Sequence, residues 1–229
     1  VCTIRALKMQ GGVPRSQLSV PDLAALRAGA ANLERHVRNL QQFGLTPVVC
    51  INRFPDDTEE EMSLVQSISE SLGVRAVPAD HWAMGGEGAT ELAQAVLDQM
   101  DEGTPEVNFL YEDGLPLADK IRTIATRISH AGSVEFTTVA KRQLEEYESL
   151  GFGPLPVCIA KTQYSFSADS SVKGAPSGHM LPVREVRLAA GAGFVVAVCG
   201  DIMTMPGLPR HPAALDIALD ENGLVVGLT

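Results

Sequence analysis

An amphipathic helix followed at once by a continuous apolar run is the feature that most constrains the fold of this chain. Apolar residues recur every three or four positions from Leu26 to Leu40, charged residues occupy the other face, and Gly44 ends the pattern. Residues 47–51 are apolar throughout, which is typical of a strand buried on both faces. A helix between two such strands is one unit of a parallel α/β sheet.

The same alternation continues along the chain. Thr58 and Glu61 form a capping-box signature for a helix that ends at Gly73, a short strand is predicted over 74–77, and a helix over 90–100. The polar segment 101–106 is the best linker candidate. Beyond it, the patterns predict strands over 107–110, 156–160, 183–188 and 194–199, helices over 117–128 and 139–150, and a hairpin across 220–223.

Composition excludes several classes of protein. The chain has 229 residues, of which 45% are hydrophobic, and a formal net charge of −10, so it is globular and no nucleic-acid binder is expected. No apolar stretch approaches the ~20 residues that span a bilayer, and no membrane partner is expected. The four cysteines are widely separated and the five histidines lack ligand-like spacing, which predicts reduced thiols, a cytoplasmic location and no metal site.

Two loops that follow predicted strands offer a binding site, because ligands of open α/β sheets bind beyond the carboxyl ends of the strands. Asn52, Arg53 and Phe54 follow the strand over 47–51, and Trp82 lies among glycines after the next strand. An indole beside Gly-rich backbone suits a planar ligand. Phe54 could instead fold back on the core from a capping turn, and Trp82 could pack in the core.

Three cations could contact anions. Residues 1–12 are interpreted as a strand end that delivers Arg5 and Lys8 to a sheet edge, and Lys161 follows the strand over 156–160. An ordinary turn and a solvated loop lysine are the alternatives. Residues 191–193 are no dinucleotide fingerprint, because a strand and not a helix follows them. The Met-rich run 200–209 could line a pocket or seal one domain against another.

Long motifs resemble one family. Thr-Ile-Arg-Ala-Leu-Lys-Met starts at Thr3, Ile-Asn-Arg-Phe-Pro at Ile51, Trp-Ala-Met-Gly-Gly-Glu-Gly at Trp82, Ala-Lys-Thr-Gln-Tyr-Ser at Ala160, and Gly-Asp-Ile-Met-Thr-Met-Pro-Gly-Leu-Pro at Gly200. Together they closely resemble the carboxyl-terminal part of formate–tetrahydrofolate ligase, collinearly from residue 1 to 229. The resemblance implies an α/β fold: the end of a parallel sheet like that of P-loop NTPases, plus a carboxyl-terminal α+β domain with a mixed sheet. We expect domains over 1–51, 52–106 and 107–229.

The resemblance also implies a function. The family makes 10-formyltetrahydrofolate from formate, ATP with Mg and tetrahydrofolate through formyl phosphate, and uses a monovalent cation such as potassium or ammonium. Its phosphate loop and catalytic residues are expected in an amino-terminal half that this chain lacks and with which it would act, and the family implies a homotetramer. Phe54 and Trp82 match the aromatic pair that brackets the pterin, and Asn52 matches a loop near adenine.

Two positions depart from the family. Gln10 stands where His is common, and Met84 stands where Lys is common. These departures are the support for an alternative, a catalytically inactive truncated paralogue with an interaction or regulatory role. On either hypothesis, we expect the chain alone to be inactive.

Overall fold

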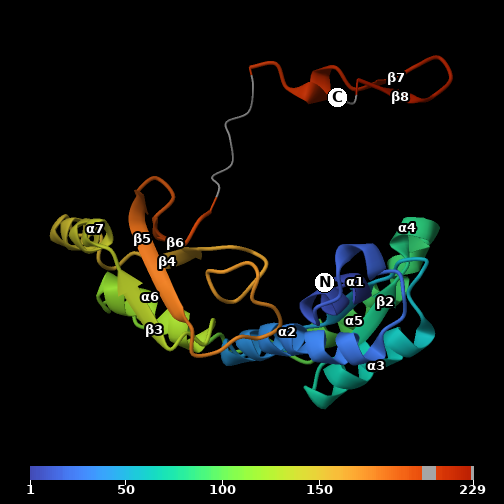
Figure 1. The fold of residues 1–229 in the computed structure, drawn as a ribbon, viewed down its shortest axis with the longest axis horizontal. Coiled ribbons are helices and arrows are strands. Elements are labelled where there is room, and N and C mark those ends of the chain that lie inside the picture. Colours follow the sequence, from blue (N-terminus) through green and yellow to red (C-terminus); the bar gives the residue numbers. More distant parts are fainter. Residues whose placement is uncertain (203–209, 228–229) are drawn as a thin grey trace.

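The computed structural model describes residues 1–202 and 210–227. Residues 1–202 form two α/β lobes, and residues 210–227 form a separate segment (Figure 1). Helix α2 (Leu23–Gln42) lies along the middle of the molecule and contacts both lobes. The predicted linker is part of an irregular segment that runs from the end of α5 (Thr90–Asp101) to the start of α6 (Leu117–Arg127). The site lies on the first lobe, and a large cavity lies between α2 and the second lobe.

The first lobe holds a small parallel sheet with helices around it. Strands β1 (Val49–Asn52) and β2 (Ala76–Ala79) pair in parallel, and Cys2 makes a further parallel bridge to Ile51. The helical elements are α1 (Ile4–Gln10), η1 (Arg15–Gln17), α2, α3 (Glu59–Ser71), α4 (His81–Met84), η2 (Gly85–Ala89) and α5. The core is formed by apolar side chains of α1, α2, α3 and β1, including Ile4, Leu26, Ile51 and Val65.

The second lobe is built on a mixed four-stranded sheet in the order β3-β5-β6-β4. Strands β3 (Ser133–Phe136) and β4 (Val157–Ala160) are the edges, and β5 (Met180–Ala189) and β6 (Phe194–Cys199) form an antiparallel pair in the centre. Helices α6 and α7 (Thr138–Ser149) pack on the sheet. Residues 210–227 contain η3 (Ala213–Leu215) and the antiparallel pair β7 (Ala218–Leu219) and β8 (Val225–Val226).

Most predicted elements are confirmed, and the mixed sheet is among them. The helices over 26–40, 58–73, 90–100, 117–128 and 139–150 and the hairpin across 220–223 are present, and residues 191–193 form the turn between two strands as expected. The first predicted boundary, at residue 52, falls at the end of β1, whose partner β2 lies beyond it, so residues 1–51 and 52–106 share one sheet. Residues 203–209 of the Met-rich run lie outside the described residues.

Three predictions were wrong. Residues 4–10 form a helix and not a strand end, because Thr3 caps it by accepting a hydrogen bond from the Ala6 N–H at 3.0 Å. Residues 107–110 form no strand, since their backbone finds no neighbouring strand and Asn108 donates to the Phe43 carbonyl. Trp82 lies in a short helix and not in a loop.

Helix α2 packs closely on α1 within the first lobe and is hydrogen-bonded to the second lobe. Near the α1–α2 crossing, a Cβ on Gly29 would lie 1.8 Å from the Leu7 carbonyl oxygen, so only glycine permits this approach. Toward the second lobe, Asn32 donates to the Gly174 carbonyl at 2.9 Å and Asn39 to the Ile128 carbonyl at 3.0 Å.

In the part of the chain that the structure describes, no helix combines the length and apolarity of a membrane span, and no cluster of metal-ligating side chains is found.

Candidate functional site at the carboxyl edge of the parallel sheet

The parallel register brings the two predicted ligand loops to one edge of the sheet. Asn52 and Ala79 are the last residues of β1 and β2, and they stand opposite each other. The Arg53 N–H donates to the Ala79 carbonyl at 3.1 Å, which ties the start of one loop to the start of the other. The segments that carry Phe54 and Trp82 therefore begin side by side, as expected for neighbouring parallel strands.

Phe54 is held by a tight turn. The Asp57 N–H donates to the Phe54 carbonyl at 3.0 Å, and the Phe54 N–H donates to the Asp57 carboxylate at 2.8 Å. Pro55 stands at the second position of this turn, where its fixed φ is favourable. The ring is half-buried and does not belong to the hydrophobic core. The capping-turn alternative is thus right about the turn, but the ring does not fold into the core.

Arg5 covers one face of the Phe54 ring. Its guanidinium carbon lies 4.3 Å from the ring centroid, and its terminal nitrogen forms an ion pair with Asp56 at 2.8 Å. About a third of the Arg5 side chain is exposed, and its Nε is buried without a hydrogen-bond partner among the described residues. Arg5 therefore reaches the candidate site, as a support for Phe54 that already holds a carboxylate of the same chain.

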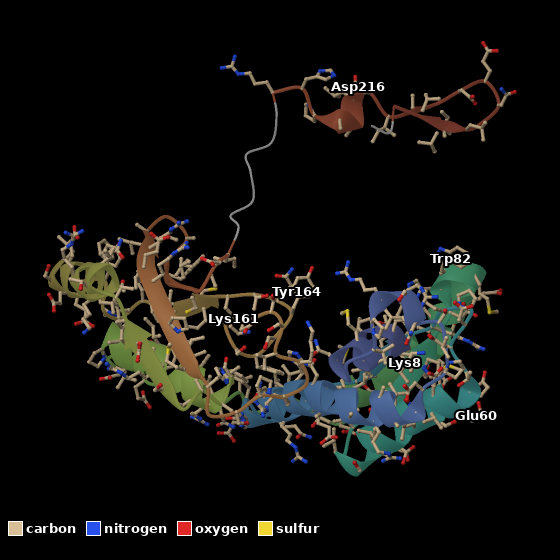
Figure 2. All side chains as sticks on the ribbon, viewed as in Figure 1. Lys8, Glu60, Trp82, Lys161, Tyr164 and Asp216 are labelled. Atoms are coloured by element: carbon tan, nitrogen blue, oxygen red, sulfur yellow. The ribbon has the colours of Figure 1, made fainter. Side chains whose placement is uncertain are left out.

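Trp82, unlike Phe54, is largely exposed to solvent. It lies on α4, which starts two residues after β2, and 80% of the side chain is exposed. Figure 2 places it on the outside of this helix. A Cβ on Gly88 would lie 2.3 Å from the Asp80 carbonyl oxygen, so glycine is required to close the turn around α4. Core packing is excluded as the role of Trp82, and no ring contact joins it to Phe54 among the described residues.

Lys8 has an internal role instead of the expected contact with an external anion. Its side chain is 1% exposed, and its ammonium donates to Glu61 at 2.9 Å and to the Val20 carbonyl at 3.0 Å. Glu61 also accepts from the Thr58 and Asp22 N–H groups. Burial alone would raise the pKa of Glu61, but the hydrogen bonds from Lys8, Thr58 and Asp22 outweigh it and hold the pKa below its ordinary value.

The two positions that depart from the family differ in their surroundings. Gln10 bridges the lobes, since its amide donates to the Tyr164 carbonyl at 3.3 Å and its carbonyl accepts from the Gly174 N–H at 2.9 Å. Met84 lies at the end of α4 close to Trp82 in sequence, and it is 56% exposed. Gln10 thus has a structural explanation, whereas Met84 adds apolar surface beside the candidate site.

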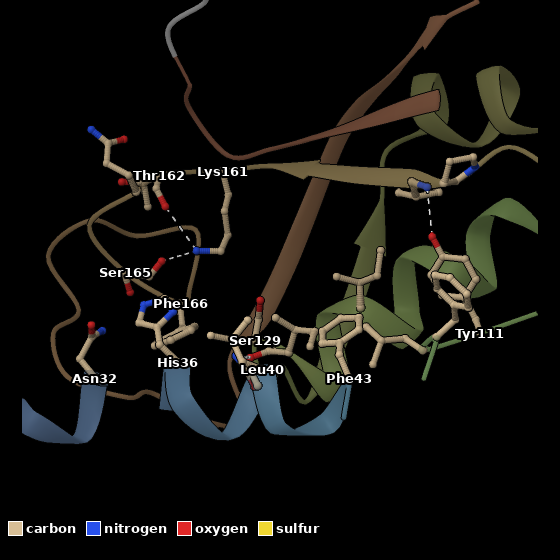
Figure 3. Close-up of a pocket in the computed structure, with 18 of the residues that line it drawn as sticks. Asn32, His36, Leu40, Phe43, Tyr111, Ser129, Lys161, Thr162, Ser165 and Phe166 are labelled. Atoms are coloured by element: carbon tan, nitrogen blue, oxygen red, sulfur yellow. Dashed lines mark hydrogen bonds between the residues drawn. The ribbon is translucent and has the colours of Figure 1, made fainter. Parts of the chain in front are cut away.

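Lys161 lies away from this edge, in the second lobe. Its ammonium donates to the carbonyls of Thr162 and Ser165, and it lines a cavity of 1010 Å³ between α2 and the second lobe (Figure 3). Burial lowers the pKa of Lys161. The loop-lysine alternative fits its two carbonyl contacts, but Lys161 is only partly open to solvent.

Two residues of the edge were missed from sequence. Asp57 fixes the Phe54 turn and is buried, and burial raises its pKa more than the Phe54 N–H lowers it. Asp56 holds Arg5. The signal for Asp57 was present, because an acidic residue three positions after the start of a proline turn often binds the turn backbone. The Asp56 contact joins residues 51 positions apart, so no local pattern indicates it.

The fold and the site define an α/β protein with a candidate ligand site at the carboxyl edge of its parallel strands. The model of one family, formate–tetrahydrofolate ligase, matches residues 1–229. The chain is 58% identical over 228 residues to the formate–tetrahydrofolate ligase of Maricaulis maris (strain MCS10) and 57% identical to that of Paracoccus denitrificans (strain Pd 1222), and each comparison covers 100% of this chain. The chain belongs to the formate–tetrahydrofolate ligase family. It spans 41% of the length of these two relatives.

Proposed function

We propose that this chain supplies the folate-binding part of an ATP-dependent formate–tetrahydrofolate ligase. The pterin ring of tetrahydrofolate would lie between Phe54 and Trp82 at the carboxyl edge of β1 and β2. The main support for this proposal is the pairing of Asn52 with Ala79, because the segments that carry Phe54 and Trp82 begin directly after these two residues. An 80% exposed indole and a phenyl ring backed by Arg5 are surfaces on which a flat heteroaromatic ring can stack.

The geometry favours a preformed half of the stack. The turn closed by Asp57 and the guanidinium of Arg5 fix the Phe54 ring before any ligand arrives. Preorganisation of this kind reduces the conformational entropy that binding must overcome. Trp82 supplies the second face from a short helix. The two rings make no contact among the described residues, which is compatible with an open space between them.

The remaining parts of the reaction belong to this proposal as well. β1 would be the end of a parallel sheet like that of P-loop NTPases, with Asn52 near the adenine of ATP. The residues of this chain form no Gly-x-x-x-x-Gly-Lys-Ser/Thr loop, so they do not fit the phosphates or Mg, and no step through ATP is derived from them. The amino-terminal part of the ligase, a monovalent cation, a homotetramer and a cytoplasmic setting complete the proposal.

The chemical contribution of this chain would be to position tetrahydrofolate for the reaction. Formyl phosphate is an activated acyl donor when bound, and holding the folate amine in reach of it converts an encounter between two molecules into a local event. The described edge supplies stacking surfaces and the Arg5 guanidinium. The isolated chain is therefore expected to bind tetrahydrofolate without turning it over.

Calorimetric titration of the chain with tetrahydrofolate tests the proposal. Stacking of a base on an aromatic side chain is worth ~1–3 kcal/mol, so Trp82→Ala and Phe54→Ala should each weaken binding by about tenfold to a hundredfold. Phe109→Ala is the matched control, since Phe109 is 83% exposed but lies by the cavity and not at the sheet edge. Unchanged affinity in Trp82→Ala, or a loss in Phe109→Ala instead, would place tetrahydrofolate elsewhere.

The alternative of an inactive regulatory paralogue receives less support. Gln10 was one of its two sequence arguments, and the hydrogen bonds of Gln10 to Tyr164 and Gly174 give that residue a role in joining the lobes. Met84 leaves both aromatic rings in place. Tetrahydrofolate binding by the chain would favour the ligase part, because a purely regulatory paralogue has no need to retain it.

A further inference from the structure

Three basic side chains lie against one buried phenyl ring in the second lobe, in a chain whose net charge is −10. The Phe166 ring is 5% exposed. His36 lies with its ring centroid 4.6 Å from that of Phe166, the Arg35 guanidinium carbon lies 5.3 Å from it, and the Lys161 ammonium 5.9 Å. His179 is the fourth member of this group, because the charges of Lys161 and Arg35 lower its pKa. We name these four residues the basic cluster.

The basic cluster has neutral partners only. Arg35 donates to the carbonyls of Ala175 and Pro176 and to the Ser177 hydroxyl, and Lys161 donates to two carbonyls. Among the described residues, no carboxylate forms an ion pair with any member of the cluster. Unpaired positive charge that is withdrawn from water is costly, and a bound anion would offset that cost.

The electrostatic effects of the cluster agree with this geometry. Burial lowers the pKa of His36 and of His179, and the charges of Lys161 and Arg35 lower both further. The two ring nitrogens of His179 are buried and make no hydrogen bond of good geometry with a described residue. Among the described residues, the titratable group that raises the pKa of Lys161 is the Cys199 thiol, and burial raises the pKa of that thiol to about 12, so it is neutral.

The cavity beside the cluster is large enough for a ligand. It measures 1010 Å³, at the upper end of the range for small-molecule sites. One wall is a face of α2 that carries His36, Leu40 and Phe43, and α6 contributes Ile124. Figure 3 shows Lys161, His36 and Phe166 gathered at one end, with Phe43 and Tyr111 toward the other. Asp113 is the one carboxylate of this wall, and its charge bears on Lys120.

We propose that this cavity binds a small aromatic anion, with a carboxylate or phosphate head at Lys161 and His36 and an aromatic body along α2 and α6. The Lys161 ammonium has three donors and uses two, so one is free for the anion. The apolar and aromatic wall suits a flat hydrophobic body. This site is separate from the proposed folate edge, because none of the residues that line the cavity belongs to β1, β2 or the loops that follow them.

Titration of the intact chain with four probes tests the site. The probes are 1-naphthylacetate, 1-naphthyl phosphate, neutral 2-(1-naphthyl)ethanol and inorganic phosphate. One or both naphthyl anions should bind, and the stronger of them identifies the head group. The neutral probe and inorganic phosphate should bind at least about tenfold more weakly, since each lacks one half of the recognition. Equal binding of the neutral probe, or no binding of either anion, would overturn the proposal.

Variants locate the binding. Lys161→Met keeps the length of the side chain and removes its charge, and it should weaken the favoured anion at least about tenfold. Lys173→Met is the control, because Lys173 is an exposed lysine of the neighbouring loop that does not line the cavity. Trp82→Ala should leave naphthyl binding unchanged, which separates this site from the folate proposal. Equal losses in Lys161→Met and Lys173→Met would refute the assignment.

A measurement on the unaltered chain guards against misfolding of the variant. The imidazole of His36 should titrate at a higher pKa when the favoured naphthyl anion is bound, because a nearby negative charge favours the protonated ring. Proton NMR of the histidine rings follows this shift. A His36 signal that titrates identically with and without saturating anion would exclude the head group from the cluster.

Discussion

Replacing Lys8 by methionine removes one partner of a completely buried ion pair. The Lys8 and Glu61 side chains are 1% and 0% exposed, so the Glu61 carboxylate would stay in the interior without its cation. Losing one partner of such a pair typically costs 3–5 kcal/mol. Glu61 keeps the hydrogen bonds from the Thr58 and Asp22 N–H groups at 3.1 and 3.2 Å, which favours the lower end, about 3 kcal/mol.

The loss should depend on pH, with a definite sign. In the unaltered chain the pKa of Glu61 is lowered from 4.5, so its contribution to stability is present above pH 4.5 and is lost as the pH falls through the lowered pKa. Without Lys8, we expect burial to outweigh the two remaining hydrogen bonds and to raise the pKa of Glu61, so the variant should be penalised above pH 4.5 and relieved on acidification. Both effects make the difference in unfolding free energy largest at neutral pH.

Urea unfolding followed by far-UV circular dichroism, at about pH 7 and about pH 4, measures this difference. Lys141→Met is the control, because Lys141 is an exposed lysine of α7. The double variant Lys8→Met with Glu61→Met should lose less than Lys8→Met alone, since no buried charge remains. A loss below about 1 kcal/mol in Lys8→Met, or one that is the same at both pH values, would refute the buried-pair reasoning.

Two further outcomes follow from packing and burial. Gly29→Ala should destabilise the chain by about 3 kcal/mol in thermal or urea unfolding, because its Cβ would meet the Leu7 carbonyl oxygen at 1.8 Å, whereas Gly191→Ala has open space and should change little. A thiol reagent at mildly alkaline pH should modify Cys158 first, since it is exposed, and burial raises the pKa of Cys199 to about 12; rapid labelling of the buried thiol would contradict the fold of the second sheet.

Local periodicity was sufficient for most of the fold. The stripes from Leu26 to Leu40 and from Leu117 to Ile128 are long enough to separate helix from strand, and the structure has helices there. The seven residues of α1 are too few for such a stripe, and the apolar residues at the start of the chain led to the prediction of a strand end. Residues 107–110 have the composition of a strand but no neighbour to pair with.

The candidate site was predictable only as far as topology reaches. Because β1 and β2 are parallel neighbours, the rule that ligands bind beyond the carboxyl ends of strands placed Phe54 and Trp82 at one edge without any knowledge of side-chain contacts. The basic cluster could not be predicted in this way. It joins α2 to a loop more than a hundred residues later, and only the packing of the two lobes brings His36 to Phe166.

Arg5 and Lys8 were predicted on a strand end, but they lie on helix α1. Spaced three residues apart, they lie on one face of α1. Arg5 pairs with Asp56 in the loop between β1 and α3, and Lys8 pairs in the interior with Glu61 in the first turn of α3. The strand interpretation treated both as free cations waiting for an external anion. The helix instead uses them to fix the segment that carries Phe54. Positive charge at this edge therefore orders an aromatic surface, and the proposed recognition of a flat ligand there would depend on stacking more than on charge.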